Sequence, residues 1–253
     1  MIVFKPRSAE MPFLDHLEEL RWRLLWSLVA LVVTTGIGFY LVTHFDVLGI
    51  LIEPIRPFLG DSKLKYLSPI DPFFITLKLA ILVGVILALP VIVYQAWAFF
   101  APALMPSEKR AIIPSLYLGV FLFAAGAAMA YYMVIPLALS FSMGFQTQSL
   151  EQNIVIGEYL GVVIRLLLAF GFAFELPVVI LVLSLLGIVT PEFLTANRRY
   201  ASLIITVAAC VLTPGDVGSS IFMMVPLFIL YEISILLSRA VARRRVAAPA
   251  LEG

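Results

Sequence analysis

Long runs of apolar residues constrain this chain more than any other feature of its sequence. An α-helix needs about 20 predominantly apolar residues to cross the hydrocarbon core of a bilayer. With 62% apolar and 13% charged residues, a water-soluble fold could not bury so much apolar surface. The sequence therefore predicts an all-α integral membrane protein, a single transmembrane domain over residues 1–253 with six transmembrane helices. The predicted spans are 24–41, 73–99, 112–135, 159–186, 200–212 and 219–237.

The last two spans form a hairpin whose first helix is unusually short. Residues 200–212 give a helix of roughly 20 Å at 1.5 Å per residue, against a hydrocarbon core of about 30 Å. A turn with the sequence Thr-Pro-Gly-Asp, ending at Asp216, separates it from the sixth span. We expect two short C-terminal helices, beside which the bilayer is thinned or a partner protein covers the mismatch.

The distribution of Lys and Arg predicts the orientation. Twelve of the 17 basic residues lie in the N-terminal segment, the loops near residues 105 and 198, and the tail 238–253, against three in the opposite loops. Cytoplasmic loops carry the excess of Lys and Arg. Both termini are therefore predicted to be cytoplasmic. The first apolar run lacks a small-residue cleavage site, which indicates an uncleaved anchor.

Prolines interrupt three of the predicted spans, at Pro90, Pro177 and Pro226. Proline removes a helical hydrogen bond and kinks the helix, so we expect a kinked, concave bundle.

The outer segments 42–72 and 137–158 are predicted to form short caps. We find no internal repeat, which argues against an inverted-repeat transporter.

The sequence offers little for catalysis. Its two histidines, His16 and His44, fall on opposite sides of the predicted membrane, and Cys210 is the single cysteine. Neither a metal site nor a histidine-activated nucleophile can be assembled from these residues. There is no phosphate-binding P-loop motif, and a formal charge of +1 argues against nucleic-acid binding. We predict that the chain is not an enzyme and carries no cofactor.

The segment 11–23, before the first span, has the pattern of an amphipathic interfacial helix. One interpretation is a membrane-surface anchor in which Glu19 and Arg23 pair at i, i+4. The other is a recognition surface. It is favoured by Asp15, Glu18 and Glu19, because an anionic leaflet does not attract three acids in five residues.

Two further acids are candidates for function. Glu175 lies near the middle of the fourth span. A carboxylate at that depth costs at least a few kcal/mol and has to face the interior or a wet cavity, or be protonated. Asp216 either caps the N-terminus of the sixth helix or has a functional role.

Several motifs together resemble the TatC family, the multi-spanning core of the twin-arginine protein translocase, which exports folded proteins using the proton-motive force. The resemblance extends from about Pro12 to Arg239. The motifs that carry it are HLEELRWRL at 16–24, DPFF at 71–74, YQAWAF at 94–99, APAL at 101–104, Glu108, FELPV at 174–178, and LTP at 212–214 with Asp216. Four residues after Asp216 the chain has Ser220, where some members have glutamine, so partner contacts there are expected to differ.

The resemblance implies a receptor for twin-arginine signal peptides in the bacterial inner membrane. It would work in a multimeric complex with the single-pass proteins TatA and, in many organisms, TatB. By motif position the signal-binding residues would be Glu19 and Glu108, with Arg21, Phe99 and Lys109 as neighbours. Glu175 would be the polar residue of the concave intramembrane face. The implied structural or partner-contacting residues are Pro54, Phe73, Pro90, Tyr131 and Asp216.

The chemistry of arginine suggests why carboxylates belong in such a receptor. A guanidinium group makes paired hydrogen bonds to one carboxylate, whereas lysine presents a point charge. Glu19 and Glu108 are on the predicted cytoplasmic side and could meet one peptide. The alternative for Glu108 is a loop acid neutralised by Lys109 and Arg110.

Two other classes of function compete with this interpretation. An ion-coupled small-solute transporter would use Glu175 as its proton site, but it would leave the acidic cytoplasmic surface unexplained. An intramembrane hydrolase is weakened by the lack of a histidine within the membrane.

Overall fold

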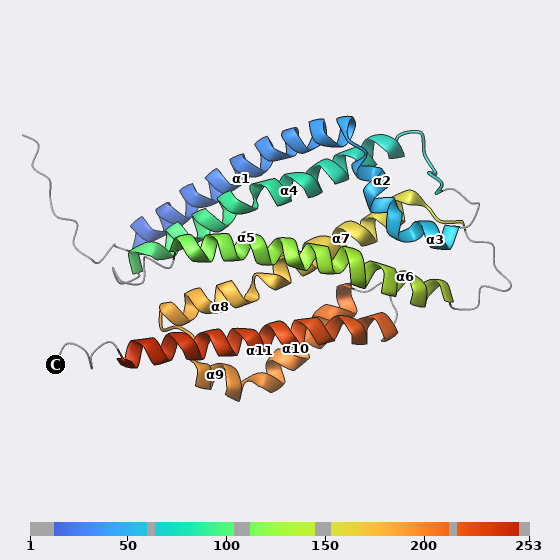
Figure 1. The fold of residues 1–253 in the computed structure, drawn as a ribbon. Coiled ribbons are helices and arrows are strands. Elements are labelled where there is room, and N and C mark those ends of the chain that lie inside the picture. Colours follow the sequence, from blue (N-terminus) through green and yellow to red (C-terminus); the bar gives the residue numbers. More distant parts are fainter. Residues whose placement is uncertain (1–12, 60–63, 104–111, 145–152, 213–216, 248–253) are drawn as a thin grey trace, which may run out of the picture.

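The computed structural model describes residues 13–59, 64–103, 112–144, 153–212 and 217–247 (Figure 1). Within these ranges the chain is helical, apart from turns and one isolated parallel bridge between Lys65 and Val155. The all-α prediction is therefore confirmed. The elements are α1 (Phe13–His44), α2 (Val47–Ile52), η1 (Glu53–Ile55), α3 (Arg56–Leu59), α4 (Asp71–Phe100), η2 (Ala101–Ala103), α5 (Ile112–Met129), η4 (Ala130–Val134), α6 (Ile135–Gly144), α7 (Ile156–Phe174), α8 (Leu176–Leu185), α9 (Pro191–Ala196), α10 (Arg198–Leu212) and α11 (Val217–Ala247).

Among the described residues, five helical segments are long and apolar enough to cross a membrane, and they coincide with five of the six predicted spans. They are His16–His44, Asp71–Phe100, Ile113–Gly144, Ile156–Leu185 and Met223–Arg243. The sixth candidate, α10, has 15 residues, about 22 Å of helix, which is short of an undistorted core. Six crossings and two cytoplasmic ends stay predictions.

Some helices are longer than the apolar runs from which they were predicted. α1 is one helix that includes residues 13–23 of the amphipathic segment and the first span. The third span passes through the π-helical turn η4 and then continues beyond residue 135 to Gly144. Of the two C-terminal helices expected to be short, only α10 is short, since α11 has 31 residues and ends at Ala247. At α1 and α11 the apolar run borders on charged residues, and helical hydrogen bonding continues through them.

The fourth predicted span is broken at Glu175, between α7 and α8. Pro177 follows two residues later and has no N–H to donate to the carbonyl of Ala173. At the break, the Glu175 N–H donates to the Phe172 carbonyl, three residues earlier, at 3.1 Å. This contact tightens the last turn of α7. The interruption predicted at Pro177 is therefore present. At Pro90 and Pro226, by contrast, α4 and α11 each continue as one helix.

The two ends of the bundle differ. α1 begins, and α4 and α11 end, at one end, which we call the N-terminal end (Figure 1). The short helices α2 and α3 lie at the other, the capped end (Figure 1). There the Tyr131 hydroxyl donates to the Ile50 carbonyl at 2.6 Å and the Tyr159 hydroxyl to the Leu51 carbonyl at 2.8 Å. Ile55 of η1 is fully buried in the main core cluster. Short helices are thus present within 42–72, as predicted, and their place on the outer side of the membrane stays a prediction.

α1 packs lengthwise on α4 at the edge of the bundle (Figure 1). Two glycines allow this close approach. A Cβ on Gly38 would lie 2.5 Å from the Ala80 carbonyl oxygen, and a Cβ on Gly84 would lie 2.7 Å from the Thr35 Cα. The Thr34 hydroxyl also donates to the Gly84 carbonyl at 2.8 Å. These contacts place the first turns of α1 beside the last turns of α4.

Candidate functional site

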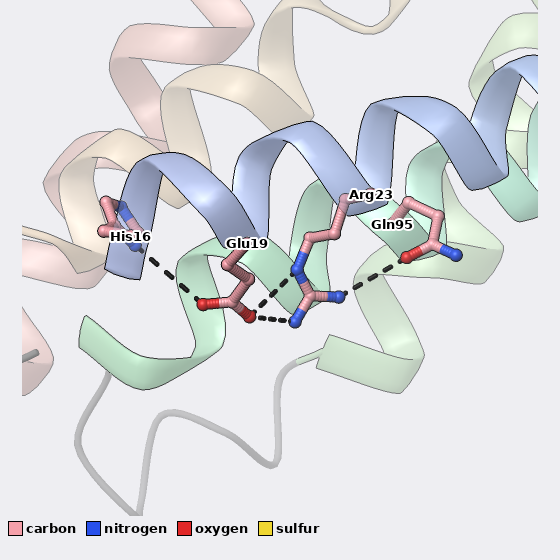
Figure 2. Close-up of polar contacts among 4 residues, drawn as sticks. All are labelled: His16, Glu19, Arg23 and Gln95. Atoms are coloured by element: carbon pink, nitrogen blue, oxygen red, sulfur yellow. Dashed lines mark hydrogen bonds and ion pairs between the residues drawn. The ribbon is translucent and has the colours of Figure 1, made fainter. Parts of the chain in front are cut away.

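A cluster of polar side chains joins α1 to α4 at the N-terminal end (Figure 2). Arg23 lies one helical turn after Glu19, and its Nε donates to Glu19 Oε1 at 3.0 Å. The Arg23 Nη2 donates to the same oxygen. The third contact of this guanidinium crosses between helices, because Nη1 donates to Gln95 Oε1 on α4 at 3.4 Å. The i, i+4 pair considered from the sequence is therefore present, and it is tied to a second helix.

The second carboxylate oxygen of Glu19 has a different environment. Oε2 is buried and has no hydrogen-bond partner among the described residues. His16 Nδ1 lies 3.9 Å from it, too far for a hydrogen bond but close enough for an ion pair when the ring is protonated. The His16 ring stacks on Phe99 of α4, with ring centroids 4.3 Å apart. A carboxylate with one unpaired oxygen thus lies beside an aromatic stack.

The other predicted signal-binding residues are placed as follows. Phe99 joins the cluster through His16. Arg21 is exposed. It lies on another face of α1 because it is two residues away from both Glu19 and Arg23. Glu108 and Lys109 lie outside the described residues, so their proximity to Glu19 stays a prediction.

A second candidate site surrounds Glu175 in the middle of the bundle. A cavity of about 200 Å³ is lined by Glu175 and Trp97 together with apolar side chains of α4, α7 and α8. Glu175 Oε1 and the Trp97 indole Nε1 are both buried without a hydrogen-bond partner in the described part of the chain. Glycine at position 119 leaves room for the carboxylate, since a Cβ there would lie 3.0 Å from Oε2. Two residues that line one cavity therefore each carry a buried polar atom without a partner in the described part of the chain.

The residues predicted to be structural have varied environments. Tyr131 contacts α2 through its hydroxyl, and Pro54 occupies the first turn of η1. Pro90 lies within α4. Phe73, in the first turn of α4, is 56% exposed and contacts the ring of Phe74, so it does not pack in the core. Asp216 lies outside the described residues.

Sequence reasoning gave no role to three residues that these sites use: His16, Gln95 and Trp97. Each stands in a motif that carries the family resemblance, so a signal was present. Their contacts with residues on other helices could not be read from spacing along the chain.

Comparisons with known proteins agree with these features. The family model of the Sec-independent protein translocase protein (TatC) matches residues 15–226. The TatC protein of Aquifex aeolicus (strain VF5) is 42% identical over 237 residues, covering 93% of this chain and 98% of that protein. The TatC protein of Escherichia coli (strain K12) is 37% identical over 231 residues, covering 90% of this chain and 88% of that protein.

A solved structure has the same fold as this chain. A crystal structure of the twin-arginine translocase receptor TatC matches with a TM-score of 0.79 and 43% identity, covering 90% of this chain and 99% of that chain. These relatives are translocase components rather than enzymes. The chain belongs to the TatC family of Sec-independent protein translocase proteins.

Proposed function

We propose that this chain is the receptor subunit of a twin-arginine translocase of the bacterial inner membrane. It binds twin-arginine signal peptides at the N-terminal end of the bundle, which faces the cytoplasm. It also organises the single-pass partners TatA and TatB, in a multimeric complex, for export of folded proteins driven by the proton-motive force. The observation that carries this proposal is the Glu19 carboxylate, which is largely buried beside the His16–Phe99 stack.

The geometry around Glu19 suits an arginine ligand. A guanidinium group binds a carboxylate through two parallel hydrogen bonds and stacks on aromatic rings, whereas an ammonium group does neither as well. Glu19 offers the carboxylate, and Phe99 offers a ring 4.3 Å from that of His16. Glu108 is proposed as the carboxylate for the second arginine, with Arg21 and Lys109 at the edges of the peptide.

The distribution of charge supports the orientation. The Lys- and Arg-rich loops and both ends of the chain belong to the N-terminal end of the bundle under the proposed topology. In that arrangement Glu19 lies at the cytoplasmic surface, where a signal peptide arrives. The short α10 lies on a side where the bilayer is thin or a partner helix covers the mismatch.

The Glu175 cavity is the proposed contact for a partner helix. A transmembrane partner can supply polar side chains for groups such as the orphaned Trp97 N–H and Glu175 oxygen. Satisfying a buried polar group within the membrane favours a bound partner over an empty cavity.

Crosslinking of a signal peptide tests the proposed function. A photoreactive twin-arginine peptide should crosslink to this chain in membranes, and a twin-lysine peptide should do so poorly. Glu19→Lys and Glu108→Lys should each reduce the twin-arginine product by about tenfold or more, because each places a cation where the peptide needs an anion.

Glu18→Lys is the matched control. It makes the same charge change on the neighbouring, exposed residue of α1. If all three variants lost the same amount of crosslinking, only the general charge of the surface would matter. If none lost any, Glu19 and Glu108 would not form the recognition site.

A further inference from the structure

The Glu19 carboxylate is already occupied by an arginine of its own helix. Arg23 donates to Glu19 Oε1 through both Nε and Nη2. A carboxylate oxygen has about two lone pairs for hydrogen bonds, so Arg23 fills the capacity of Oε1. Oε2 is free of hydrogen bonds to described residues, but it is buried. In this state the carboxylate presents no exposed, vacant oxygen to a ligand.

This ion pair differs from the other arginine–carboxylate pairs in the described part of the chain. Arg23 and Glu19 are 23% and 22% exposed, whereas the partners in Arg56–Glu53 and Arg198–Glu232 are each at least half exposed. An exposed pair is weakened by solvent and salt, and a partly buried pair is weakened less. The Glu19–Arg23 pair is therefore the best protected of the three.

Arg23 is also held from outside its own helix. Its Nη1 donates to Gln95 Oε1 of α4 at 3.4 Å, and Gln95 is itself partly buried (Figure 2). This contact uses the edge of the guanidinium that Glu19 leaves free. Gln95 thus favours the arrangement in which Arg23 remains hydrogen-bonded to Glu19. Among the described hydrogen bonds, none joins Gln95 to Glu19 itself.

We propose that Arg23 is an internal competitor for the signal-peptide arginine, and that Gln95 determines how firmly it competes. This inference rests on the proposed receptor function. A peptide arginine that binds Glu19 through two parallel hydrogen bonds needs both carboxylate oxygens, so Arg23 has to leave Oε1 first. Exchanging one guanidinium for another pairs the buried carboxylate both before and after peptide binding, and the cost of displacing Arg23 makes peptide binding readily reversible. Arg23 and Gln95 are thereby affinity-determining residues of the site.

Arg23→Lys is the most informative substitution, because it keeps the positive charge. Lysine retains the charge but cannot make the two hydrogen bonds to Oε1 and the contact with Gln95 together. We expect this variant to bind a fluorescent twin-arginine peptide roughly threefold to tenfold more tightly than the parent protein. Gln95→Ala should tighten binding by about twofold, because it removes only the outer contact of Arg23. Both changes are measured by anisotropy on the full chain in detergent micelles.

Three comparisons isolate the mechanism. In a Glu19→Gln background, Arg23→Lys should not change the affinity for the peptide, since the carboxylate for which the two arginines compete is gone. A twin-lysine peptide should tighten by the same factor as the twin-arginine peptide, because any cation has to displace Arg23 before it reaches Glu19. Arg198→Lys weakens another arginine–glutamate pair, at 2.9 Å between α10 and α11, and should leave peptide binding unchanged.

The outcomes separate this inference from the proposed function. Unchanged or weaker peptide binding by the folded Arg23→Lys variant would overturn the competition, and weaker binding would assign Arg23 to positioning Glu19 instead. A tighter Arg23→Lys variant beside an unchanged Gln95→Ala variant would overturn the part given to Gln95. A parent protein that binds twin-arginine and twin-lysine peptides equally would overturn the receptor function itself.

Discussion

At the scale of single residues, two carboxylates carry the functional argument, and their surroundings differ. Glu19 is paired with a cation at the end of the bundle, whereas Glu175 Oε1 lies in an apolar cavity with no hydrogen-bond partner in the described residues. A buried carboxylate without a partner is costly to folding. Under the proposed function, contacts between Glu175 and a partner helix offset this cost.

Replacing Glu175 with alanine tests that role. We expect crosslinking between a photoreactive residue at Ala96, which lines the cavity, and a TatA or TatB helix to fall severalfold. The free energy of unfolding in detergent should stay the same or rise by about 1 kcal/mol, because an unsatisfied carboxylate is removed. Glu192→Ala, at an exposed position of α9, is the control and should change neither quantity. Normal export with unchanged partner crosslinks would contradict the assignment.

At the scale of elements, the pairing of α1 with α4 positions the proposed recognition site. α1 has few other contacts, and its side chains at Trp22, Trp26 and Tyr40 are all more than half exposed. The helix is therefore held mainly by its contact with α4, where Gly38 and Gly84 bring the two backbones together. Close approach through small residues is a common way for membrane helices to associate. Gln95 and Phe99 reach the Glu19 cluster because this packing aligns the ends of the two helices.

Gly84→Ala tests the role of that close approach. The added Cβ would lie 2.7 Å from the Thr35 Cα and 2.9 Å from its nitrogen, so the helices have to separate. We expect a loss of about 1–3 kcal/mol in unfolding free energy and weaker twin-arginine peptide binding. The measurements are thermal unfolding in detergent and peptide anisotropy.

Gly36→Ala is the matched control, on the same helix pair. A Cβ at Gly36 has nothing within 4 Å, and alanine favours helix over glycine by about 1 kcal/mol. This variant should be as stable as the parent or more stable. Equal losses in both variants would mean that the contact at Gly84 has no special part in the pairing.

At the scale of the whole molecule, the bundle has an N-terminal end and a capped end, and the sequence predicts that basic residues gather at the former. α1 begins and α11 ends at the same end of the bundle (Figure 1), as expected for a chain with an even number of crossings. α10 is the one predicted span that is too short for an undistorted bilayer. If α10 crosses the membrane as predicted, the hairpin of α10 and α11 is the side where the bilayer has to thin or a partner has to cover the mismatch.

Labelling of single cysteines tests the proposed orientation. In a Cys210→Ser background, Tyr66→Cys at the capped end should react with a membrane-impermeant maleimide applied to spheroplasts. Glu192→Cys, in α9, should react only after the membrane is opened. Both positions are exposed in the structure, so access within the protein is matched. The reverse pattern would invert the topology and place Glu19 on the wrong side for a signal peptide.

The fold class, most of the span positions and the family could be predicted from the amino-acid sequence. These properties follow from local quantities: the length of apolar runs, the positions of basic residues and prolines, and short motifs. The interruption beside Pro177 and the shortness of α10 could be predicted because each depends on a few neighbouring residues. The ends of α1 and α11 could not, since the end of an apolar run does not end helical hydrogen bonding.

Which polar atoms of the candidate sites lack a hydrogen-bond partner could be seen only in the tertiary structure. The spacing of Glu19 and Arg23 allowed either a pair or an open carboxylate, and the contact of Arg23 with Gln95, 72 residues away, accompanies the pair. The orphaned atoms of Trp97 and Glu175 became visible only when α4 was packed beside the break between α7 and α8. Hydrogen-bond satisfaction depends on neighbours far apart in the chain, and a sequence pattern records only neighbours along it.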